Sequence, residues 1–383
     1  MIKTADVVII GGGISGCSIA YNLAKKGVKN VVVLEKKYLA SGATGRCGAG
    51  VRQQWGTEMN CRLAMKSIKF FENAKEELEY DRDIEFKQGG YLIVASTEKE
   101  DKQFKKNVEL QKSLGIPVEY LSPKEAKEIV PHLNIEGLIS ATYCPKDGHL
   151  NPFLTTDAYA KAAKRLGVKI YTFTEVVGIK TNAGKVCGVI TSKGDEISTR
   201  IVVNAAGGYS KQVAKMAGID LPVYSERHQI LVTEPVEPMQ KPMVMSFSLN
   251  IYCQQTPHGS FIMGRGDPDE PRDLRITSSW KFLDEMSKTV TNLLPPLGKL
   301  RIIRQWAGLY NITPDKQPIL GPIKELEGFY LAVGFSGHGF MLAPMTGLLI
   351  AEQIVGEETT IPIHMLSKDR FERGELVLEP SVV

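Results

Sequence analysis

The hydrophobic pattern of the first 35 residues predicts a strand, a helix and a second strand. Residues 5–10 (ADVVII) and 30–34 (NVVVL) are continuous apolar runs, which are typical of buried parallel strands, and residues 14–27 have helical spacing. Two parallel strands joined through a helix make a βαβ unit. The glycines at residues 11–13 therefore lie where the first strand ends and the helix begins.

Further along the chain the pattern alternates between helical and strand-like stretches. Ser122, followed by Pro123 and Glu125, has the form of a capping box that opens a helix. The other predicted helices lie at about 57–79, 98–114, 151–166 and 278–294. Strand-like runs occupy residues 91–96, 169–181, 185–194, 197–208, 228–235, 250–256 and 260–266. A last strand at 328–333 is followed by a final helix with Pro344 in its first turn, and we expect this helix to pack on the first domain.

This order of elements predicts an α/β class combined with antiparallel β-structure. The run at 197–208 ends in small residues and returns the chain to the first sheet, whereas residues 221–318 favour an antiparallel sheet covered by helices. The 383 residues exceed what one hydrophobic core usually supports. We therefore predict a Rossmann-like dinucleotide-binding domain from residues 1–84, 144–220 and 319–383, interleaved with an α+β substrate domain from residues 85–143 and 221–318.

Composition and charge narrow the functional classes. The net charge of +4 is spread along the chain without a basic run interleaved with aromatics, so neither nucleic acid nor an anionic membrane is implied as a partner. The six cysteines show no spacing suited to zinc or an iron–sulfur cluster, so we predict no metal site and reduced thiols in a cytoplasmic protein. The four-residue apolar run before Gly11 is too short for a signal peptide or a membrane span.

The strongest chemical signal is a dinucleotide-binding fingerprint. Gly11, Gly13 and Gly16 satisfy G-x-G-x-x-G between the first strand and its helix, and Glu35 ends the second strand, where a carboxylate can accept hydrogen bonds from a ribose. The glycines permit the tight turn, the approach of pyrophosphate to the helix N-terminus and close packing of helix on strand. This pattern alone does not separate NAD from FAD.

Three later segments favour FAD. Residues 41–50 (SGATGRCGAG) continue from Glu35 as a loop of small residues, and residues 202–207 (VVNAAG) end a strand in small residues. Residues 334–341 (GFSGHGFM) precede the terminal helix, whose N-terminal amides could stabilise a negative charge on a reduced flavin. Each segment alone could be an ordinary glycine turn, but an NAD enzyme needs none of them.

The extended pattern VVIIGGGISGCSIAYNLAKKGVKNVVVLEK, the AAG strand end, GFSGHGF and WAGLYNITPDKQPILGP (306–322) resemble the D-amino acid oxidase family over essentially the whole chain. The likeness is to the group of sarcosine oxidase β subunits and glycine oxidases, and within it to β subunits of dye-linked L-proline dehydrogenases. It implies an FAD domain of the p-hydroxybenzoate-hydroxylase and glutathione-reductase type. The cofactor-binding residues it implies are Gly11, Gly13, Ile14, Ser15, Gly16, Glu35, Lys36, Gly42, Ala43, Thr44, Arg46, Gly48, Ala49, Gly50, Val177, Ala205, Ala206, Gly207, Gly334, Gly337, His338, Gly339, Phe340 and Met341.

The resemblance also implies the residues at the substrate. Arg52 matches an arginine that clamps the substrate carboxylate, for which a guanidinium offers a bidentate fork, although it could be a structural arginine. Tyr252 and Tyr310 match active-site tyrosines and could equally be sheet core. His338 matches a histidine beside the flavin. We predict that His228 and His132 are surface or satisfied structural residues.

Three departures from the family change the expected chemistry. A cysteine that binds flavin covalently in monomeric sarcosine oxidase aligns with Gly308, so we expect FAD to be noncovalent. The lysine that pairs with the substrate carboxylate aligns with Met341, which leaves Arg52 without its cationic companion. The lysine credited with activating oxygen aligns near Ile262, and an aliphatic side chain cannot stabilise superoxide. Oxygen is therefore expected to be a poor electron acceptor.

If electrons do not go to oxygen, they leave through another centre, and the resemblance implies a larger α flavoprotein subunit in a hetero-oligomer. The histidine that carries FMN covalently in heterotetrameric sarcosine oxidase has its match near residues 156–158 (TDA), where no histidine stands. Any FMN is thus expected to be noncovalent and shared with the partner.

The sequence leaves several functions open. The favoured one is an FAD-dependent dehydrogenase of an amino acid with a secondary amine, which delivers hydride from L-proline to flavin N5 and yields 1-pyrroline-5-carboxylate. The nearest alternative is a sarcosine or glycine oxidase that makes hydrogen peroxide. A noncatalytic electron-relay subunit belongs to another class, and a tRNA-modifying flavoprotein is disfavoured by the absence of a basic run.

Overall fold

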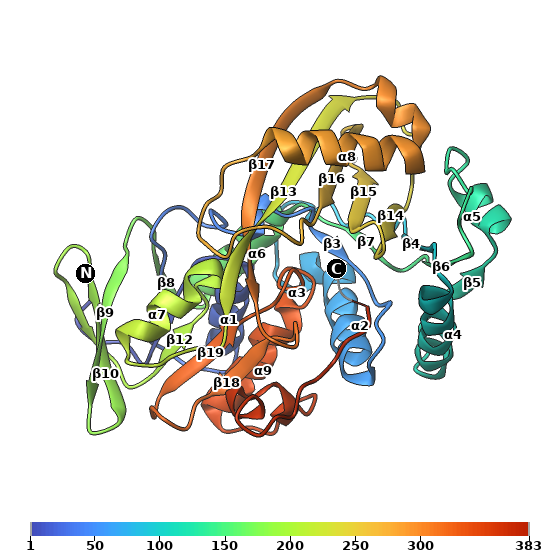
Figure 1. Cartoon of the computed structure of the whole chain (residues 1–383). Helices are drawn as coiled ribbons and strands as arrows, with labels where there is room; N and C mark the ends of the chain where they lie inside the picture. The colour runs from blue at the N-terminus through green and yellow to red at the C-terminus, as the bar shows by residue number, and fades with distance from the viewer. Residues whose placement is uncertain (1, 382–383) are drawn as a thin grey trace.

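A computed structural model describes residues 2–381, which form two large sheets and two small ones. In Figure 1 the eight-stranded sheet occupies the upper part of the molecule and the six-stranded sheet the lower part. The six-stranded sheet has the order β18 (Ile319–Pro322), β19 (Phe329–Val333), β12 (Val202–Asn204), β1 (Val7–Ile10), β2 (Val31–Leu34), β8 (Lys169–Tyr171). Neighbouring strands are parallel except at β18, which runs antiparallel to β19.

The continuous apolar runs of β1 and β2 are explained by burial on both faces of this sheet. Val7, Ile9, Val31 and Val33 pack against one set of elements, whereas the intervening residues of both strands pack against another. The first face is covered by the helices α1 (Ile14–Lys25), α6 (Pro152–Arg165) and α9 (Ala343–Val355), and α2 (Glu58–Glu72) packs against α9. The second face is covered by α7 (Ser210–Met216) and by a three-stranded sheet of β9 (Val176–Asn182), β10 (Lys185–Thr191) and β11 (Glu196–Ser198).

The eight-stranded sheet is antiparallel except for one parallel pair, β14 with β4. Its order is β17 (Ile302–Ile312), β13 (Tyr224–Pro235), β16 (Ser260–Arg265), β15 (Ile251–Gln255), β14 (Met243–Ser246), β4 (Tyr91–Ala95), β6 (Ser140–Cys144), β5 (Glu119–Leu121). The amphipathic helix α8 (Trp280–Leu293) and the short α5 (Pro123–Ile129) pack on one face. The opposite face carries Tyr252 and looks toward the first sheet, since successive residues of a strand alternate between faces.

The remaining elements lie outside the two large sheets. Helix α4 (Glu98–Ser113) begins with a capping box at Thr97, and α5 begins with the predicted one at Ser122. The others are α3 (Ala74–Glu77), β3 (Gly50–Val51), β7 (Gly148–His149), η1 (Thr44–Arg46), η2 (Gly207–Tyr209), η3 (Pro295–Lys299), η4 (His364–Leu366) and η5 (Lys368–Arg370).

Three predicted elements are interrupted in the structure, and one of them is the run at 197–208, which divides into β11 and β12. The helix expected at 57–79 breaks at Asn73, whose side-chain amide donates to the Lys69 carbonyl at 2.8 Å and so competes with helical hydrogen bonding. The strand expected at 169–181 divides into β8 and β9. Between them Phe173 adopts a positive φ of 50°, and its amide bonds to the Lys37 carbonyl, which turns the chain along the end of β2.

The last helix packs on the first domain's helix α1, as predicted. A Cβ atom on Gly347 of α9 would lie 2.1 Å from the Ser18 hydroxyl oxygen, so only glycine allows the two helices to approach this closely. The strands of the two large sheets fall within the two predicted domains, apart from Cys144 at the end of β6. The division into domains itself stays a prediction.

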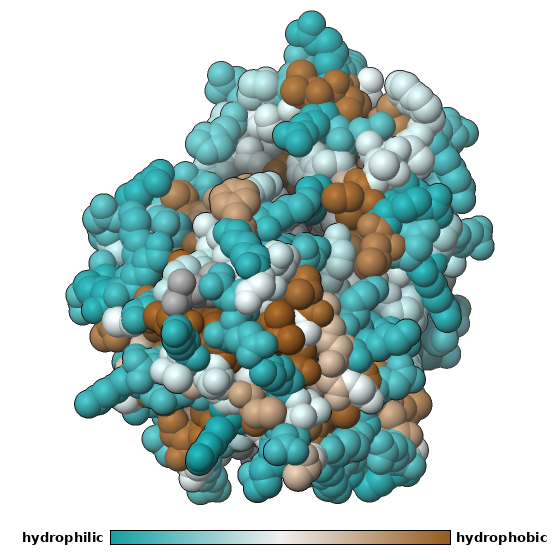
Figure 2. All heavy atoms as spheres, turned by 90° about the vertical axis from the view of Figure 1, so that its left-hand side faces the viewer, coloured by the Kyte–Doolittle hydropathy of each residue, from teal (hydrophilic) through white to brown (hydrophobic). Residues whose placement is uncertain are grey.

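The face of the molecule seen in Figure 2 is mostly hydrophilic. On the face that carries α7, β9 and β10, hydrophilic side chains dominate and hydrophobic ones gather in smaller groups between them (Figure 2). Within residues 2–381, no helix combines the length and apolar character needed to cross a membrane.

Candidate active site

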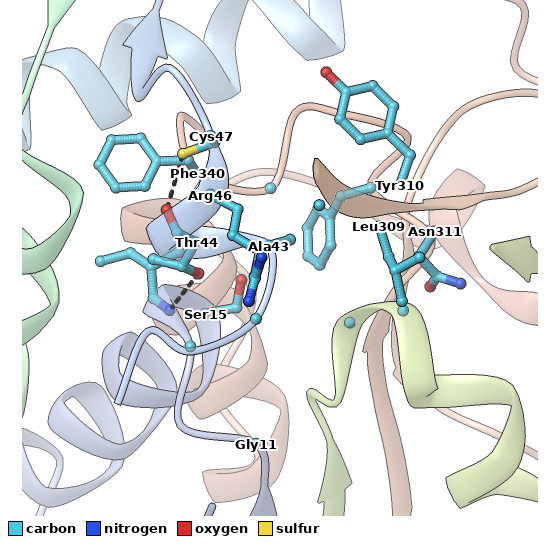
Figure 3. Close-up of a pocket in the computed structure, with 18 of the residues that line it drawn as sticks. Gly11, Ser15, Ala43, Thr44, Arg46, Cys47, Leu309, Tyr310, Asn311 and Phe340 are labelled. Atoms are coloured by element: carbon cyan, nitrogen blue, oxygen red, sulfur yellow. Dashed lines mark hydrogen bonds between the residues drawn. The ribbon is translucent and has the colours of Figure 1, made fainter. Parts of the chain in front are cut away.

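A single cavity extends from the glycine turn after β1 to the inner face of the eight-stranded sheet. It collects residues from both sheets and from the loops between them, so segments far apart in the sequence share one site. All the predicted site residues line it except Gly16, Val177 and Gly334. Figure 3 shows Thr44, Arg46 and Cys47 on one side of this cavity and Leu309–Asn311 across from them.

The three glycines of the fingerprint are not all required for the same steric reason. A Cβ atom on Gly11 would lie 2.4 Å from the Ala205 carbonyl oxygen, and one on Gly16 would lie 2.0 Å from the Gly11 carbonyl oxygen. Both glycines therefore serve close packing, and Gly16 lies beneath the cavity rather than in its wall. A Cβ atom on Gly13 would meet only the Thr44 hydroxyl, at 3.1 Å, so this position borders open space at the start of α1. That opening is where the fingerprint places pyrophosphate.

Glu35 is held in place by hydrogen bonds from the glycine turn after β1 and from the residues that follow Glu35 itself. Its carboxylate accepts from the Gly12 amide at 2.8 Å, the Lys37 amide at 2.8 Å and the Ser41 hydroxyl at 3.2 Å. A carboxylate has about four acceptor positions, so capacity remains for a ribose hydroxyl. Lys36 is also engaged, with its ammonium 3.0 Å from the centre of the Tyr209 ring.

The loop of small residues forms the cavity wall after β2. Thr44 accepts from the Ile14 amide at 3.2 Å, and Arg46 donates to the carbonyls of Ser41 and Ala307, at 3.2 and 3.0 Å. These bonds hold the loop between α1 and β17. Gly42, like Gly207 in the opposite wall, has nothing within 4 Å of where a Cβ would stand, so both border open space.

The predicted role of Val177 is not supported by the position of its side chain. Val177 is 49% exposed, whereas the preceding residue, Val176, is buried and lines the cavity. The break between β8 and β9 sets this alternation, which the sequence did not reveal. Gly334 also stands outside the wall: its amide donates to the Asn311 side chain at 2.8 Å and so fixes the turn after β19.

Arg52 lies in the cavity wall and is 2% exposed. Its guanidinium donates to the carbonyls of Gln54 and Ser381 and stacks 3.8 Å from the Trp55 ring centre. These bonds use two of its five N–H groups. Burial lowers the pKa of Arg52 from its usual value, as expected for a desolvated cation.

His338 lies beside Arg52, with its ring edge-on to Trp55 at a centroid distance of 4.6 Å. Burial, reinforced by the charges of Arg52 and Lys316, lowers the pKa of His338 well below its usual value. Its imidazole is therefore neutral at physiological pH. Met341, which aligns with the lysine that the family uses at the substrate carboxylate, lines the same cavity.

The prediction for His228 was wrong, whereas that for His132 is confirmed. His132 is a satisfied structural residue, since its Nε2 lies 3.1 Å from the Gln240 side-chain oxygen. His228 lines the cavity instead, stacked between Tyr310 and Tyr252, and its buried Nε2 has no hydrogen-bond partner within the described residues. Both tyrosines line the cavity, so neither is simple sheet core.

The residues near Gly308 agree with a flavin held without a covalent bond. Gly308 lines the cavity and carries no nucleophile. Cys47 also lines it, but its sulfur donates to the Thr44 carbonyl at 3.0 Å, and burial raises the pKa of Cys47 to about 11. The thiol is thus protonated and engaged. Among residues 2–381, no cluster of histidine, cysteine or acidic side chains is arranged to hold a metal ion.

Sequence reasoning missed residues that support the site from the eight-stranded sheet. Tyr91, Met243 and Met245 line the cavity from β4 and β14. Asp147 is fully buried and accepts from the Gln53 amide at 2.8 Å and the Gln54 side chain at 3.0 Å, which fixes the irregular segment after Arg52. The strand β4 was predicted from the sequence, but β14 was not, and neither was the sheet face that meets the cofactor.

Comparison with known proteins agrees with this geometry. Residues 6–353 match the family described as DAO, FAD dependent oxidoreductase. The chain is 33% identical to the sarcosine oxidase subunit beta of Arthrobacter sp, over 98% of this chain and 93% of that one. A solved L-proline dehydrogenase from P. horikoshii is 42% identical and covers 98% of this chain and 100% of that one, with a TM-score of 0.93. A glycine oxidase from Geobacillus kaustophilus is 26% identical, covering 96% and 99%, with a TM-score of 0.88.

A Rossmann-like fold with a glycine-lined dinucleotide cavity facing an antiparallel sheet defines a flavin-dependent oxidoreductase. The chain belongs to the DAO family of FAD-dependent oxidoreductases. Its cofactor is FAD, and its chemistry is the oxidation of an amino-acid C–N bond. The open positions at Gly13, Gly42 and Gly207, together with the anchored Glu35, fit that cofactor along the length of the cavity.

Proposed function

We propose that this protein is the catalytic subunit of an L-proline dehydrogenase. The observation that carries the proposal is that Arg52, Tyr252, Tyr310 and His338 meet in one cavity with the flavin-binding loops. The similarity to the L-proline dehydrogenase from P. horikoshii over nearly the full length of both chains supports this substrate. The product is then 1-pyrroline-5-carboxylate.

The residues of the chain supply binding and orientation. When bound, FAD supplies the hydride acceptor. Arg52 binds the substrate carboxylate through the N–H groups that it does not donate to backbone carbonyls, and the bonds to Gln54 and Ser381 hold the guanidinium in one orientation. His338 is neutral, so it adds no second positive charge beside Arg52 and the substrate amine.

We further propose that electrons pass to a partner subunit rather than to oxygen. Ile262 stands on β16 two residues before Gly264, on the same sheet face, where a cation would be needed to stabilise superoxide. The Arthrobacter relative, which is similar to this chain over 98% of its length, is the β subunit of a sarcosine oxidase, and this supports a hetero-oligomer. An FMN shared with the partner stays a hypothesis. The segment that matches the FMN-carrying histidine lies on α6, where Thr156 and Ala158 are buried and the Asp157 side chain is accessible.

The second candidate is an oxidase of sarcosine or glycine. It is favoured by the similarity to sarcosine oxidase subunit beta and to a glycine oxidase. The two candidates differ in the amine that reduces the flavin and in the acceptor that reoxidises it. A noncatalytic relay subunit requires neither a carboxylate ligand nor a substrate cavity.

Anaerobic reduction of the FAD-loaded chain tests these proposals. We expect L-proline to bleach the flavin absorbance faster than sarcosine or glycine, and air to reoxidise it much more slowly than an artificial dye does. Bleaching by sarcosine but not by L-proline would overturn the substrate. Rapid reoxidation by air would overturn the dehydrogenase assignment. A native complex that contains FAD as its sole flavin would overturn the FMN hypothesis.

A further inference from the structure

Three aromatic rings form a row across the inner face of the eight-stranded sheet. The His228 imidazole stacks on Tyr310 at a centroid distance of 4.3 Å and an interplanar angle of 5°, and on Tyr252 at 5.9 Å and 11°. The three rings come from the separate strands β13, β17 and β15. All three line the cavity, so the row forms part of its wall.

A glycine makes room for this row on one side. His228 pairs directly with Gly308 on β17, and Tyr310 stands two residues further along that strand, on the same sheet face. On the other side, a Cβ atom on Gly264 would lie 2.4 Å from the Tyr252 ring, so Tyr252 crosses β16 only because glycine stands there. The row is therefore specified by the sequence of the sheet.

The row also reaches both glycine loops of the flavin site. A Cβ atom on Gly48 would lie 3.2 Å from the Tyr252 ring, and a Cβ atom on Gly337 would lie 2.7 Å from the Tyr310 ring. Gly48 belongs to the loop after β2, and Gly337 to the loop before α9. His228, which lies between the two tyrosines, is consequently held opposite the part of the cavity that these loops enclose.

The imidazole has unused hydrogen-bonding capacity. Its Nε2 is buried without a partner in the described part of the chain, and such a group is costly unless a ligand satisfies it. Burial lowers the pKa of His228 to about 4, so the ring is neutral at pH 7 and one of its nitrogens is an acceptor.

We propose that His228 is a substrate-binding residue that accepts a hydrogen bond from the N–H of the amino-acid amine while Arg52 binds the carboxylate. This inference rests on the proposed function, because it assigns a partner to the substrate nitrogen. It gives the site a preference for primary and secondary amines, which keep an N–H when neutral, over neutral tertiary amines. The flanking tyrosines keep the ring from rotating away.

Matched ligands and matched variants test the inference in the FAD-loaded enzyme. L-proline and (S)-tetrahydrofuran-2-carboxylate share a ring and a carboxylate but differ in the N–H. The Kd of L-proline is read from the concentration dependence of anaerobic flavin reduction, and that of the oxygen analogue from its perturbation of the flavin spectrum. His228→Phe keeps a stacked ring and removes both nitrogens, whereas His228→Gln restores an acceptor. FAD content and melting temperature check that each variant is folded.

We expect His228→Phe to raise the Kd of L-proline roughly tenfold and that of the oxygen analogue less than about twofold, which is the effect of one lost hydrogen bond. His228→Gln should recover part of the loss. Equal weakening of both ligands, or no change in either, would overturn the inference. If L-proline fails to reduce the wild-type flavin, the proposed substrate is wrong. The role of His228 is then tested by the same comparison of Kd values with sarcosine and its oxygen analogue methoxyacetate.

Discussion

Arg52 shows how a single buried side chain can be fixed before the substrate arrives. A desolvated guanidinium is costly unless its N–H groups are satisfied. Two backbone carbonyls and the face of Trp55 satisfy part of it here, and one of those carbonyls belongs to Ser381, more than 300 residues away in the sequence. The proposed carboxylate ligand is thus positioned by the tertiary structure.

Replacing Arg52 with alanine is expected to lower kcat/KM for the amino acid by a factor of about 10² to 10³, because a buried charge partner of the carboxylate is lost. Steady-state kinetics with a dye acceptor measures this. Arg62→Ala is the matched control, since Arg62 is exposed on α2 and pairs with Glu58. Full activity of a folded Arg52→Ala protein would favour the relay alternative.

A second residue-scale prediction concerns acid stability. His149 is buried next to the flavin loop, and burial, with the charge of Lys87, lowers its pKa to about 4. In the unfolded chain the histidine has its ordinary pKa of about 6.5. The stability due to the neutral ring is therefore present above that pH and is lost as the pH falls toward 4. Asp147, whose pKa burial raises to about 6, acts in the opposite direction.

We therefore compare wild type with His149→Gln, which leaves the contribution of Asp147 in both proteins. Between pH 7 and pH 5 the wild type should lose about 2 kcal/mol more of its unfolding free energy than the variant. Denaturant unfolding at the two pH values measures the difference. An identical pH dependence in both proteins would show that His149 does not titrate as a buried ring.

At the scale of elements, the β1–α1 turn depends on glycine for packing as much as for ligand access. Gly16→Ala would place a methyl group 2.0 Å from the Gly11 carbonyl oxygen, so the helix must move away from the turn. We expect the purified variant to lose most of its FAD, as judged from the flavin-to-protein absorbance ratio. Gly298→Ala, in η3, is the control and should retain a full complement of FAD.

The C-terminal segment is fastened by a buried ion pair. Arg370 donates to Asp315 at 2.7 and 2.9 Å, and both side chains are fully buried. Arg370→Leu leaves the carboxylate uncompensated, so we expect a loss of about 3–5 kcal/mol in unfolding free energy. Arg373→Ala breaks exposed pairs with Asp369 and Glu375, and a loss of less than about 1 kcal/mol is expected. Similar losses in both variants would contradict this difference.

At the scale of the whole molecule, the cofactor cavity joins the two large sheets. Its wall takes Gly11 and Ala205 from one sheet and Tyr252 and Tyr310 from the other. Bound FAD should therefore stabilise both parts together. Free FAD at 100 times its Kd is expected to add about 2.7 kcal/mol to the unfolding free energy of the apoprotein. Calorimetry of apo- and holoprotein measures this, and Gly16→Ala should show a much smaller gain at the same FAD concentration, because its Kd for FAD is higher.

Much of the fold and of the cofactor site could be predicted because both depend on local patterns. Continuous apolar runs located β1 and β2, helical spacing located α1 and α9, and capping residues located α5. The cofactor loops were visible because glycine and alanine are needed wherever a backbone approaches a ligand. The split between β8 and β9 was missed because hydrogen bonds to the end of β2, remote in sequence, turn the chain at Phe173.

By itself the sequence determined the dinucleotide fingerprint, the strand and helix periods and the family. These properties depend on neighbouring residues and on the spacing between them. Only the tertiary structure decided that His228 joins Tyr252 and Tyr310, that Val176 replaces Val177 in the wall, and that Ser381 holds Arg52. Each of these contacts joins separate strands or loops, and strand register and chain reversal, rather than local pattern, bring such residues together.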